Sequence, residues 1–99
     1  MVTSEEIMTA LKPVEDPELG MSIVDLGLVY RAEEVEGHLE VDFTLTYPGC
    51  PLGDQIEEDI VDQLARRFHL DVKARLVFIP AWTAERMSEE ARVGLGYPI

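Results

Sequence analysis

The sequence predicts an α+β fold in which a small mixed three-stranded sheet carries helices on one face. A change of apolar period supports this prediction. Residues 39–46 alternate apolar and polar side chains, as a half-buried strand does. From Leu52 to Phe68 the apolar residues recur every four positions, as on one buried face of a helix. A second alternating segment at 71–79 predicts another strand. The expected order is helix, strand, strand, helix, strand and short helix.

The first helix is expected at the N-terminus, where residues 3–6 (TSEE) have the form of a capping box. Pro13 limits this helix. Residues 14–22 contain proline, glycine and acidic residues, which are typical of a polar loop. The apolar run 23–30 follows, and its second half predicts a strand buried on both faces or nearly so.

The remaining elements follow from turn and breaker residues. Residues 33–38 predict a hairpin turn, so the strands on either side should pair antiparallel. The third strand is expected to end at Pro80. A last short helix is expected over about 88–93, with Gly94 and Gly96 stopping it.

Length and charge narrow the classes of function. The 99 residues are expected to form one domain, 1–99, with a single core. A net charge of −12 argues against nucleic acid and anionic membranes, because phosphate recognition needs clustered Lys and Arg. No segment approaches the roughly 20 apolar residues of a membrane span, and no signal peptide is recognisable. One cysteine forbids an intrachain disulfide and fits a reducing cytoplasm.

That cysteine, Cys50, lies between the second strand and the central helix. Pro51 suits the first turn of the helix, which would make Cys50 the N-cap. A thiol in that position meets the positive end of the helix dipole, which favours the thiolate, a nucleophile and metal ligand. Asp54, Glu57 and Glu58 oppose ionisation, so we expect only modest activation. The alternative is that Cys50 packs as a small buried hydrophobe.

Other polar or aromatic residues are further site candidates. Asp25 could cap backbone N–H groups at a turn, or it could lie beside Cys50 in a pocket. Thr46 could face solvent or hydrogen-bond the loop that contains Cys50. Trp82 follows the third strand and could cover the core or form a ligand platform. Met87 is interpreted as packing. Neither histidine has metal-ligand spacing to the other or to the cysteine; one lies in a turn, where it should be solvated, and the other should end the central helix.

Three segments occur in a characteristic order: residues 16–30 (DPELGMSIVDLGLVY), the motif T-x-x-x-C-P at 46–51, and P-A-W-T at 80–83 with M-S-E-E-A-R at 87–92. Together they resemble the three signatures of the metal-sulfur cluster biosynthetic family, which includes SufT and the core of PaaD. The resemblance covers nearly the whole chain. It implies the α+β fold of the iron-sulfur cluster assembly superfamily, shared with the carboxy-terminal domain of NifU-type scaffolds. It also implies a role in maturing iron-sulfur proteins.

By this resemblance, Cys50 matches the motif cysteine and would contact iron or a cluster. The supporting positions are the acids of the first signature and two neighbours of the cysteine, namely Asp16, Glu18, Asp25, Thr46 and Pro51. Trp82 and Met87 mark a candidate partner surface. Ala81 stands where many relatives have a second proline. The chain also lacks the cysteine-rich tail of PaaD-type members, so a specific role in phenylacetate oxidation is not expected.

The chemistry of clusters limits the mechanism. A cluster generally takes four protein ligands, whereas one chain offers one thiolate, so the chain is not a self-sufficient scaffold. A two-fold dimer would bring two Cys50 thiolates to one site, leaving the other positions to small thiols, to carboxylates such as Asp25 or to a client. The leading hypothesis is a non-enzymatic, cytoplasmic maturation factor that holds iron or a cluster transiently and works with assembly proteins and client apoproteins. The alternatives are an interaction adaptor without cluster binding and a thiol-dependent enzyme using Cys50, for which no histidine is placed as base.

Overall fold

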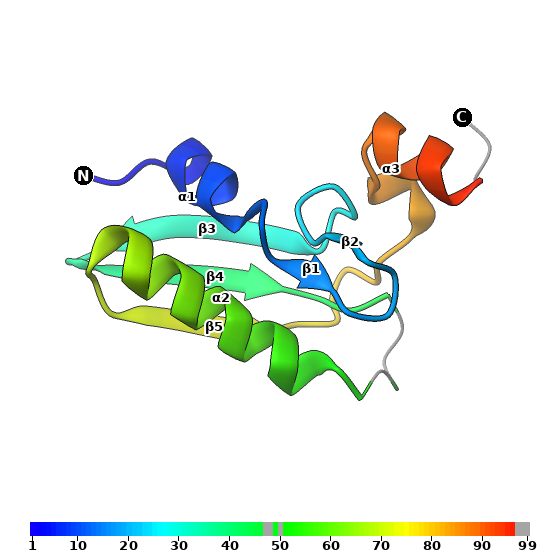
Figure 1. Cartoon of the computed structure of the whole chain (residues 1–99). Coiled ribbons are helices and arrows are strands. Elements are labelled where there is room, and N and C mark those ends of the chain that lie inside the picture. Colours follow the sequence, from blue (N-terminus) through cyan, green and yellow to red (C-terminus); the bar gives the residue numbers. More distant parts are fainter. Residues whose placement is uncertain (47–48, 50, 97–99) are drawn as a thin grey trace.

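A computed structural model describes residues 1–46, 49 and 51–96. In this part of the chain, β3 (Val29–Val35), β4 (His38–Phe43) and β5 (Val72–Leu76) form a sheet in that order. β3 pairs with β4 antiparallel, and β4 pairs with β5 parallel (Figure 1). The predicted α+β class with a mixed three-stranded sheet is confirmed.

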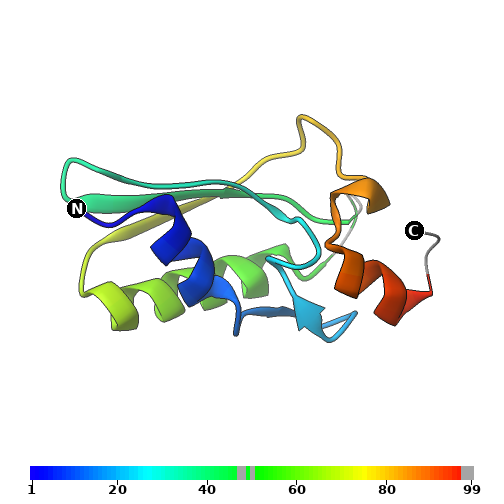
Figure 2. The same cartoon turned by 90° about the horizontal axis from the view of Figure 1, so that it is seen from above.

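Helices α1 (Ser4–Leu11) and α2 (Gly53–Phe68) lie on the same face of the sheet (Figure 2). The predicted capping box of α1 is present, because the Thr3 hydroxyl accepts from the Glu6 N–H at 3.2 Å and the Glu6 carboxylate accepts from the Thr3 N–H at 3.1 Å. The alternating strand and the helical stripe predicted from the sequence meet in one core. Fully buried members of that core are Leu39, Val41, Phe43, Ile56, Ile60 and Leu64.

The first strand differs from the prediction. Residues 23–27 form turns, and β3 begins only at Val29 and continues to Val35. It is mostly half-buried, with Ala32 its one buried residue, because it is an outer strand of the sheet and the helices cover one face. The loop predicted at 14–22 contains a short antiparallel hairpin of β1 (Glu15–Asp16) and β2 (Met21–Ser22).

The third strand is shorter than predicted and ends at Leu76 rather than at Pro80. The reason is pairing: β4 stops at Phe43, and the Val77 N–H makes the last bond to the Phe43 carbonyl at 2.8 Å. Beyond that point Ile79 is 89% exposed.

The C-terminal region contains a 3₁₀ turn, η1 (Ala84–Arg86), that the sequence analysis missed, and the predicted last helix, α3 (Glu89–Leu95). The Ser88 hydroxyl caps α3, and Gly96, with φ +80°, ends it. Gly94 lies inside the helix and does not stop it. α3 lies beyond the end of the sheet rather than over its face (Figures 1 and 2).

Candidate functional site

The start of α2 differs from the expectation based on Pro51. Leu52 is the N-cap, its carbonyl accepts from the Ile56 N–H at 3.0 Å, and no side chain caps this end. Pro51 therefore precedes the helix and is exposed, and the prediction that Cys50 is the N-cap is wrong. Cys50 lies outside the described residues, so the expectations about its thiol stay predictions.

The described residues on either side of Cys50 lie at the carboxyl ends of two strands: Leu45 and Thr46 follow β4, and the start of α2 packs against the last residue of β5. A Cβ added to Gly53, the first residue of α2, would lie 3.3 Å from Leu45 Cδ1 and 3.4 Å from Leu76 Cδ2. Leu45 is buried just after β4, and Thr46 is half-buried. The contact packs the start of α2 against the chain that leaves β4 and β5.

Thr44 connects this end of the sheet to the first signature. It is 1% exposed, and its N–H donates to the Leu28 carbonyl at 2.8 Å. Its hydroxyl has no hydrogen-bond partner within residues 1–46, 49 and 51–96. A buried, unpaired hydroxyl is costly to a fold. Thr44 was not among the site residues predicted from the sequence, and only its place two residues before Thr46 could have indicated it.

Asp16, the first acid of the first signature, is 1% exposed and is used by its own turn. Its carboxylate accepts from the Glu18 N–H at 2.8 Å and the Leu19 N–H at 3.3 Å, and its carbonyl accepts from the Gly20 N–H at 2.7 Å. This is the way in which Asp side chains stabilise turns. Asp16 holds the turn between β1 and β2, whereas Glu18 is exposed.

Asp25 lies in the turn at 23–27 and is half-buried. Its main-chain carbonyl accepts from the Ser88 N–H at 2.7 Å. In the described part of the chain, no hydrogen bond holds its carboxylate, so the side-chain cap considered for it is not seen. Asp25 thus presents a carboxylate that the turn does not use, in contrast to Asp16.

The segment 80–88, called here the C-terminal strap, runs back across this turn. The Trp82 indole N–H donates to the Leu26 carbonyl at 2.7 Å, and the Tyr30 hydroxyl donates to the Pro80 carbonyl at 2.9 Å. The Arg86 guanidinium lies 4.5 Å from the centre of the Tyr30 ring. Segments far apart in the sequence, the first and third signatures, are therefore in contact.

Gly27 is the point of closest approach between the turn and the C-terminal strap. It has φ +73°, and a Cβ there would lie 2.2 Å from the Arg86 carbonyl oxygen. Glycine supplies both the left-handed backbone and the missing side chain. Met87, next in the chain, is 5% exposed, which confirms its interpretation as packing. Trp82 is half-buried against the core and keeps an exposed part.

The opposite face of the sheet carries ion pairs that the sequence analysis missed. Arg31 pairs with Glu40 and Asp42, and the Arg75 guanidinium donates to Asp42 at 2.9 Å. His38, expected to be solvated, lies 2.7 Å from Glu40. The hydrogen bond from His38, together with Arg31, lowers the pKa of Glu40, and Asp42 raises the pKa of Arg75. Strand register, which brings these side chains together, could have indicated them.

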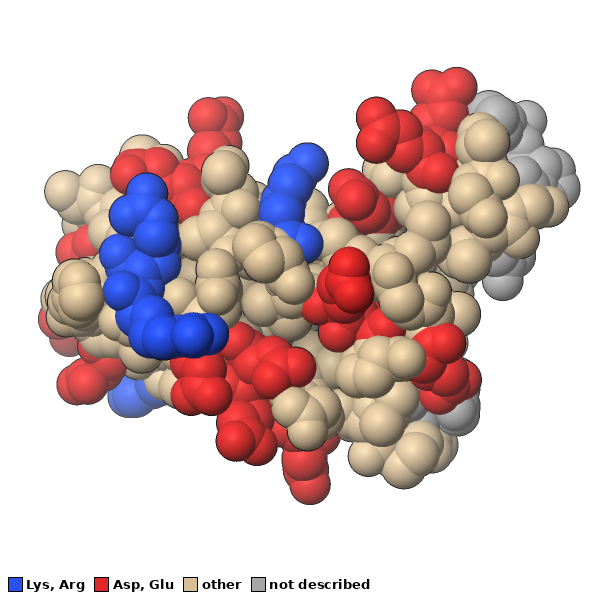
Figure 3. All heavy atoms as spheres, viewed as in Figure 1, with Lys and Arg blue, Asp and Glu red and all other residues tan. Residues whose placement is uncertain are grey.

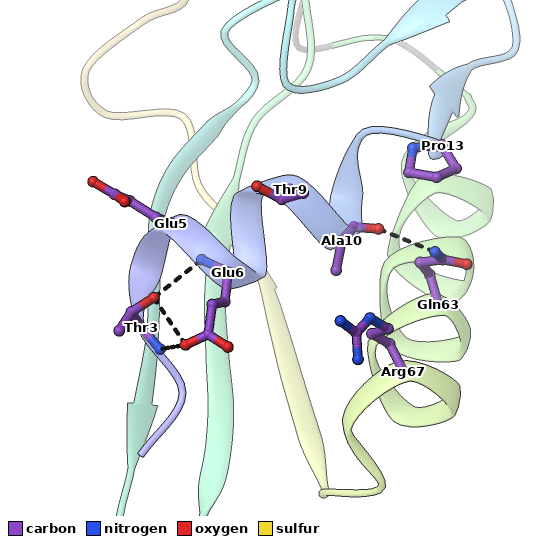
Figure 4. Close-up of a pocket in the computed structure, with 8 residues that line it drawn as sticks. All are labelled: Thr3, Glu5, Glu6, Thr9, Ala10, Pro13, Gln63 and Arg67. Atoms are coloured by element: carbon purple, nitrogen blue, oxygen red, sulfur yellow. Dashed lines mark hydrogen bonds between the residues drawn. The ribbon is translucent and has the colours of Figure 1, made fainter.

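A pocket of about 480 Å³ lies between α1 and α2, away from the motifs (Figure 4). Gln63 of α2 donates to the Ala10 carbonyl across it at 3.0 Å. On its rim, hydrogen bonds from Thr3 lower the pKa of Glu6. None of the predicted site residues lines this pocket.

No group of three or more His, Cys, Asp and Glu side chains in the described part of the chain could hold a metal ion. Likewise, no helix within it is both long and apolar enough to cross a membrane.

Comparison with known proteins relates this geometry to a family. A family model described as iron-sulfur cluster assembly protein matches residues 4–75, from α1 to β5. The Fe-S protein maturation auxiliary factor YitW of Bacillus subtilis is 42% identical over 94 residues, 93% of this chain and 92% of that protein. The Fe-S protein maturation auxiliary factor SufT of Staphylococcus aureus is 45% identical over 85 residues, 84% of this chain and 97% of that protein. A crystal structure of a domain of unknown function from Bacillus anthracis has a TM-score of 0.90 at 35% identity, covering 96% of this chain and 92% of that one.

Proposed function

This chain belongs to the iron-sulfur cluster assembly protein family, and from that membership we propose that it is a non-enzymatic maturation factor that carries or delivers iron-sulfur clusters to client apoproteins. One observation carries the proposal: two relatives of more than 40% identity are named Fe-S protein maturation auxiliary factors. They are matched over 92% and 97% of their own length, so the likeness extends over whole proteins of this size.

In this proposal Cys50 is the thiolate that contacts the cargo. It is the single cysteine of the chain, and a reducing cytoplasm keeps it free. Thiolates are the usual protein ligands of iron-sulfur clusters, and one thiolate fills one of about four positions. The cargo would therefore be held transiently, with the other positions filled by a second copy, by small thiols or by the client.

The arrangement of the acids supports Asp25 as the companion of Cys50. The Asp16 carboxylate already accepts two backbone N–H bonds. If it turned to a metal ion instead, the N–H groups of Glu18 and Leu19 would lose their acceptor. The Asp25 carboxylate makes no such bond to the described residues. A half-buried carboxylate that makes no hydrogen bond to the described residues is suited to complete a metal coordination shell transiently.

The positions of the histidines argue against a thiol enzyme. The chain has two, and cysteine catalysis generally needs one beside the thiol as a base. His69 ends α2, a helix of 16 residues and about 24 Å, at the end opposite to Pro51. His38 begins β4, about 20 Å along the strand from the end that leads to Thr46. Both lie at the far end of the sheet from the residues that flank Cys50.

The test is anaerobic reconstitution of the purified chain with ferrous iron and sulfide, beside the Cys50→Ser variant. We expect about half a cluster per chain in a dimer for the unchanged protein and none for the variant. Bound iron and sulfide per chain, the mass in solution and transfer to an apo-ferredoxin are the readouts. Circular dichroism of the variant checks that it folds.

Equal loading of the two proteins would show that Cys50 is not the ligand. Absence of iron from both would overturn cluster carrying. The remaining function would then be an adaptor that recruits clients for another assembly protein.

A further inference from the structure

The outer edge of β5 is open. Next to the strand, the Asp71 carbonyl and the Val77 N–H bond to β4, each at 2.8 Å. Successive residues of a strand direct their backbone groups to opposite sides. The N–H and C=O groups of Val72, Ala74 and Leu76 therefore point away from β4, where no strand of the described residues pairs with them.

A groove of about 530 Å³ runs between this edge and α2. Its floor is apolar, formed by half-buried Val61, Val72 and Ala74. Its rim on α2 consists of carboxylates three or four residues apart, which places them on one helix face: Asp54, Glu57, Glu58 and Asp62. Figure 3 shows acidic side chains gathered over α2, and the basic ones of its last turn lie at the other end of the helix.

Exposed apolar side chains continue the line of the edge. Leu76, Phe78 and Ile79 are 36%, 40% and 89% exposed. Leu76 also lies beside Gly53, the first residue of α2. An open sheet edge that continues into exposed apolar residues is a typical place for another chain to bind. The groove leads to the start of α2, and Cys50 is three residues before that start.

We propose that this edge groove, formed by β5 and the acidic face of α2, binds an extended basic segment of a client apoprotein as a fourth strand of the sheet. The segment would bond the outward backbone groups of Val72, Ala74 and Leu76. Its alternate side chains would face α2, where lysine or arginine meets the carboxylate rim and apolar residues meet the floor. The identity of the partner as a client rests on the proposed function; the binding itself does not.

Charge selects this occupant over a second copy of the chain. The rim is acidic and the whole chain carries −12, so a second copy brings like charge to the groove. The backbone groups of Lys73 and Arg75 alternate with the outward groups and face β4. Lys73 is the one basic residue among the described residues that line the groove, against four carboxylates, and Arg75 is held by Asp42 on the opposite face. A basic strand satisfies both the backbone edge and the carboxylates.

The probe is a short capped peptide of alternating lysine and valine. Strand addition predicts alternating protection of the β5 amides, whereas non-specific binding does not. In amide hydrogen exchange, Val72, Ala74 and Leu76 should gain protection on binding, whereas Lys73 and Arg75 are already bonded to β4. Added salt should weaken binding, because the rim is exposed. A fully N-methylated version of the peptide, and one of alternating glutamate and valine, should not bind.

Two variants test the two halves of the groove. Ala74→Pro removes an outward N–H without breaking a bond to β4, and proline is tolerated at such a position in an edge strand. Because the peptide would lose a backbone donor, this variant should bind it more weakly. Glu58→Lys with Asp62→Lys reverses two exposed rim charges and should weaken peptide binding about tenfold. Glu36→Lys with Glu85→Lys makes the same change of charge at exposed positions outside the groove and should leave the affinity unchanged. If Ala74→Pro does not fold, the charge variants and the exchange pattern still decide the question.

Protection that does not alternate along β5, binding of the glutamate peptide, or an unchanged affinity after rim reversal would overturn the proposal. Alternating protection that is present in the protein without peptide and disappears on dilution would also overturn the proposal, because a second copy of the chain would then occupy the edge. Cys50→Ser should bind the lysine peptide as the unchanged protein does. Failure of the groove is thus separable from failure of cluster carrying, which is measured by iron loading.

Discussion

The helix-covered sheet and the motif end of the molecule are stabilised by different kinds of contact. Between the sheet and its helices, fully buried side chains such as Val41 of β4 and Ile60 of α2 fill one core. At the motif end, defined by the turn at 23–27 and the C-terminal strap, contacts to main-chain carbonyls join the two segments: the Ser88 N–H bonds the Asp25 carbonyl at 2.7 Å, the Trp82 indole N–H bonds the Leu26 carbonyl at 2.7 Å, and Gly27 lies against the Arg86 carbonyl. The helix-covered sheet depends on how much apolar surface is buried, whereas the motif end buries side chains such as Leu26 and also depends on the backbone geometry at Gly27. The first tolerates side chains of similar volume, and the second does not tolerate an added Cβ.

The largest effect is expected in the core between the sheet and its helices, from Ile60→Ala in α2. Removing this fully buried side chain leaves a cavity, and we expect a loss of about 4 kcal/mol in the free energy of unfolding, with a fall in Tm of roughly 20 °C. Ile79→Ala is the matched control at an 89% exposed isoleucine and should change stability by less than about 0.5 kcal/mol. Urea denaturation followed by circular dichroism measures both. Equal effects would show that burial does not dominate the stability of the sheet.

At the motif end, Gly27→Ala should cost about 3 kcal/mol, because the new Cβ forces the strap away in addition to the cost of a left-handed backbone. Gly20→Ala is the control: its φ of +67° is similar, but a Cβ there meets nothing within 4 Å, so about 1 kcal/mol is expected. The fluorescence of Trp82, the single tryptophan, should shift to the red in Gly27→Ala while circular dichroism stays near that of the unchanged protein. Similar losses in the free energy of unfolding in both variants would mean that the close approach to Arg86 does not contribute to the cost of Gly27→Ala.

Trp82→Phe should cost about 1 kcal/mol, because the Leu26 carbonyl loses its donor while most of the aromatic surface is kept. Tyr30→Phe removes the corresponding bond to the Pro80 carbonyl at an exposed position, where water replaces the hydroxyl, so less than about 0.5 kcal/mol is expected. Hydrogen exchange at the Ser88 N–H reports whether the strap opens more often. A larger effect of Tyr30→Phe would contradict this ranking.

The smallest effect concerns the charged face of the sheet and pH. The pKa of Glu40 is lowered by His38 and Arg31, so its stabilising contribution is present above the pKa of the unfolded chain and is lost as the pH falls through the folded pKa. Glu40→Gln should therefore lose stability near neutral pH, and the difference from the unchanged protein should shrink over roughly pH 5 to 2. Glu36→Gln, at an exposed position of the hairpin, is the control. A difference that grows in acid would reverse the assigned sign.

Most elements were predictable where the signal is local. The capping box at Thr3 and Glu6, the stripe that contains Ile60 and the alternation around Val41 act within one or two turns or along one strand, and all three were confirmed. The wrong predictions concern element bounds that are set by contacts with another segment of the chain. Strand β5 stops because Phe43 ends its neighbour, and the start of α2 at Gly53 follows its packing against Leu45 and Leu76.

The candidate site shows the same division. The sequence alone singled out the chain segments, the acids of the first signature and the motif cysteine, because residue type and spacing are properties of the chain. It could not distinguish Asp16, whose carboxylate is used by its own turn, from Asp25, whose carboxylate is not. That difference depends on hydrogen bonds, which composition and period do not encode.

The sequence by itself determined the fold class, the order of the main helices and strands and the family resemblance, because periodic burial and capping depend on residues close together in the chain. Only the tertiary structure decided that the C-terminal strap crosses the first signature, that Gly27 must lack a side chain and that β5 has an open edge beside an acidic helix face. The physical reason is distance along the chain: the bond from Trp82 to Leu26 joins residues 56 positions apart. No local pattern specifies such a pair, because it forms only when the whole core has brought both segments to the same end of the sheet.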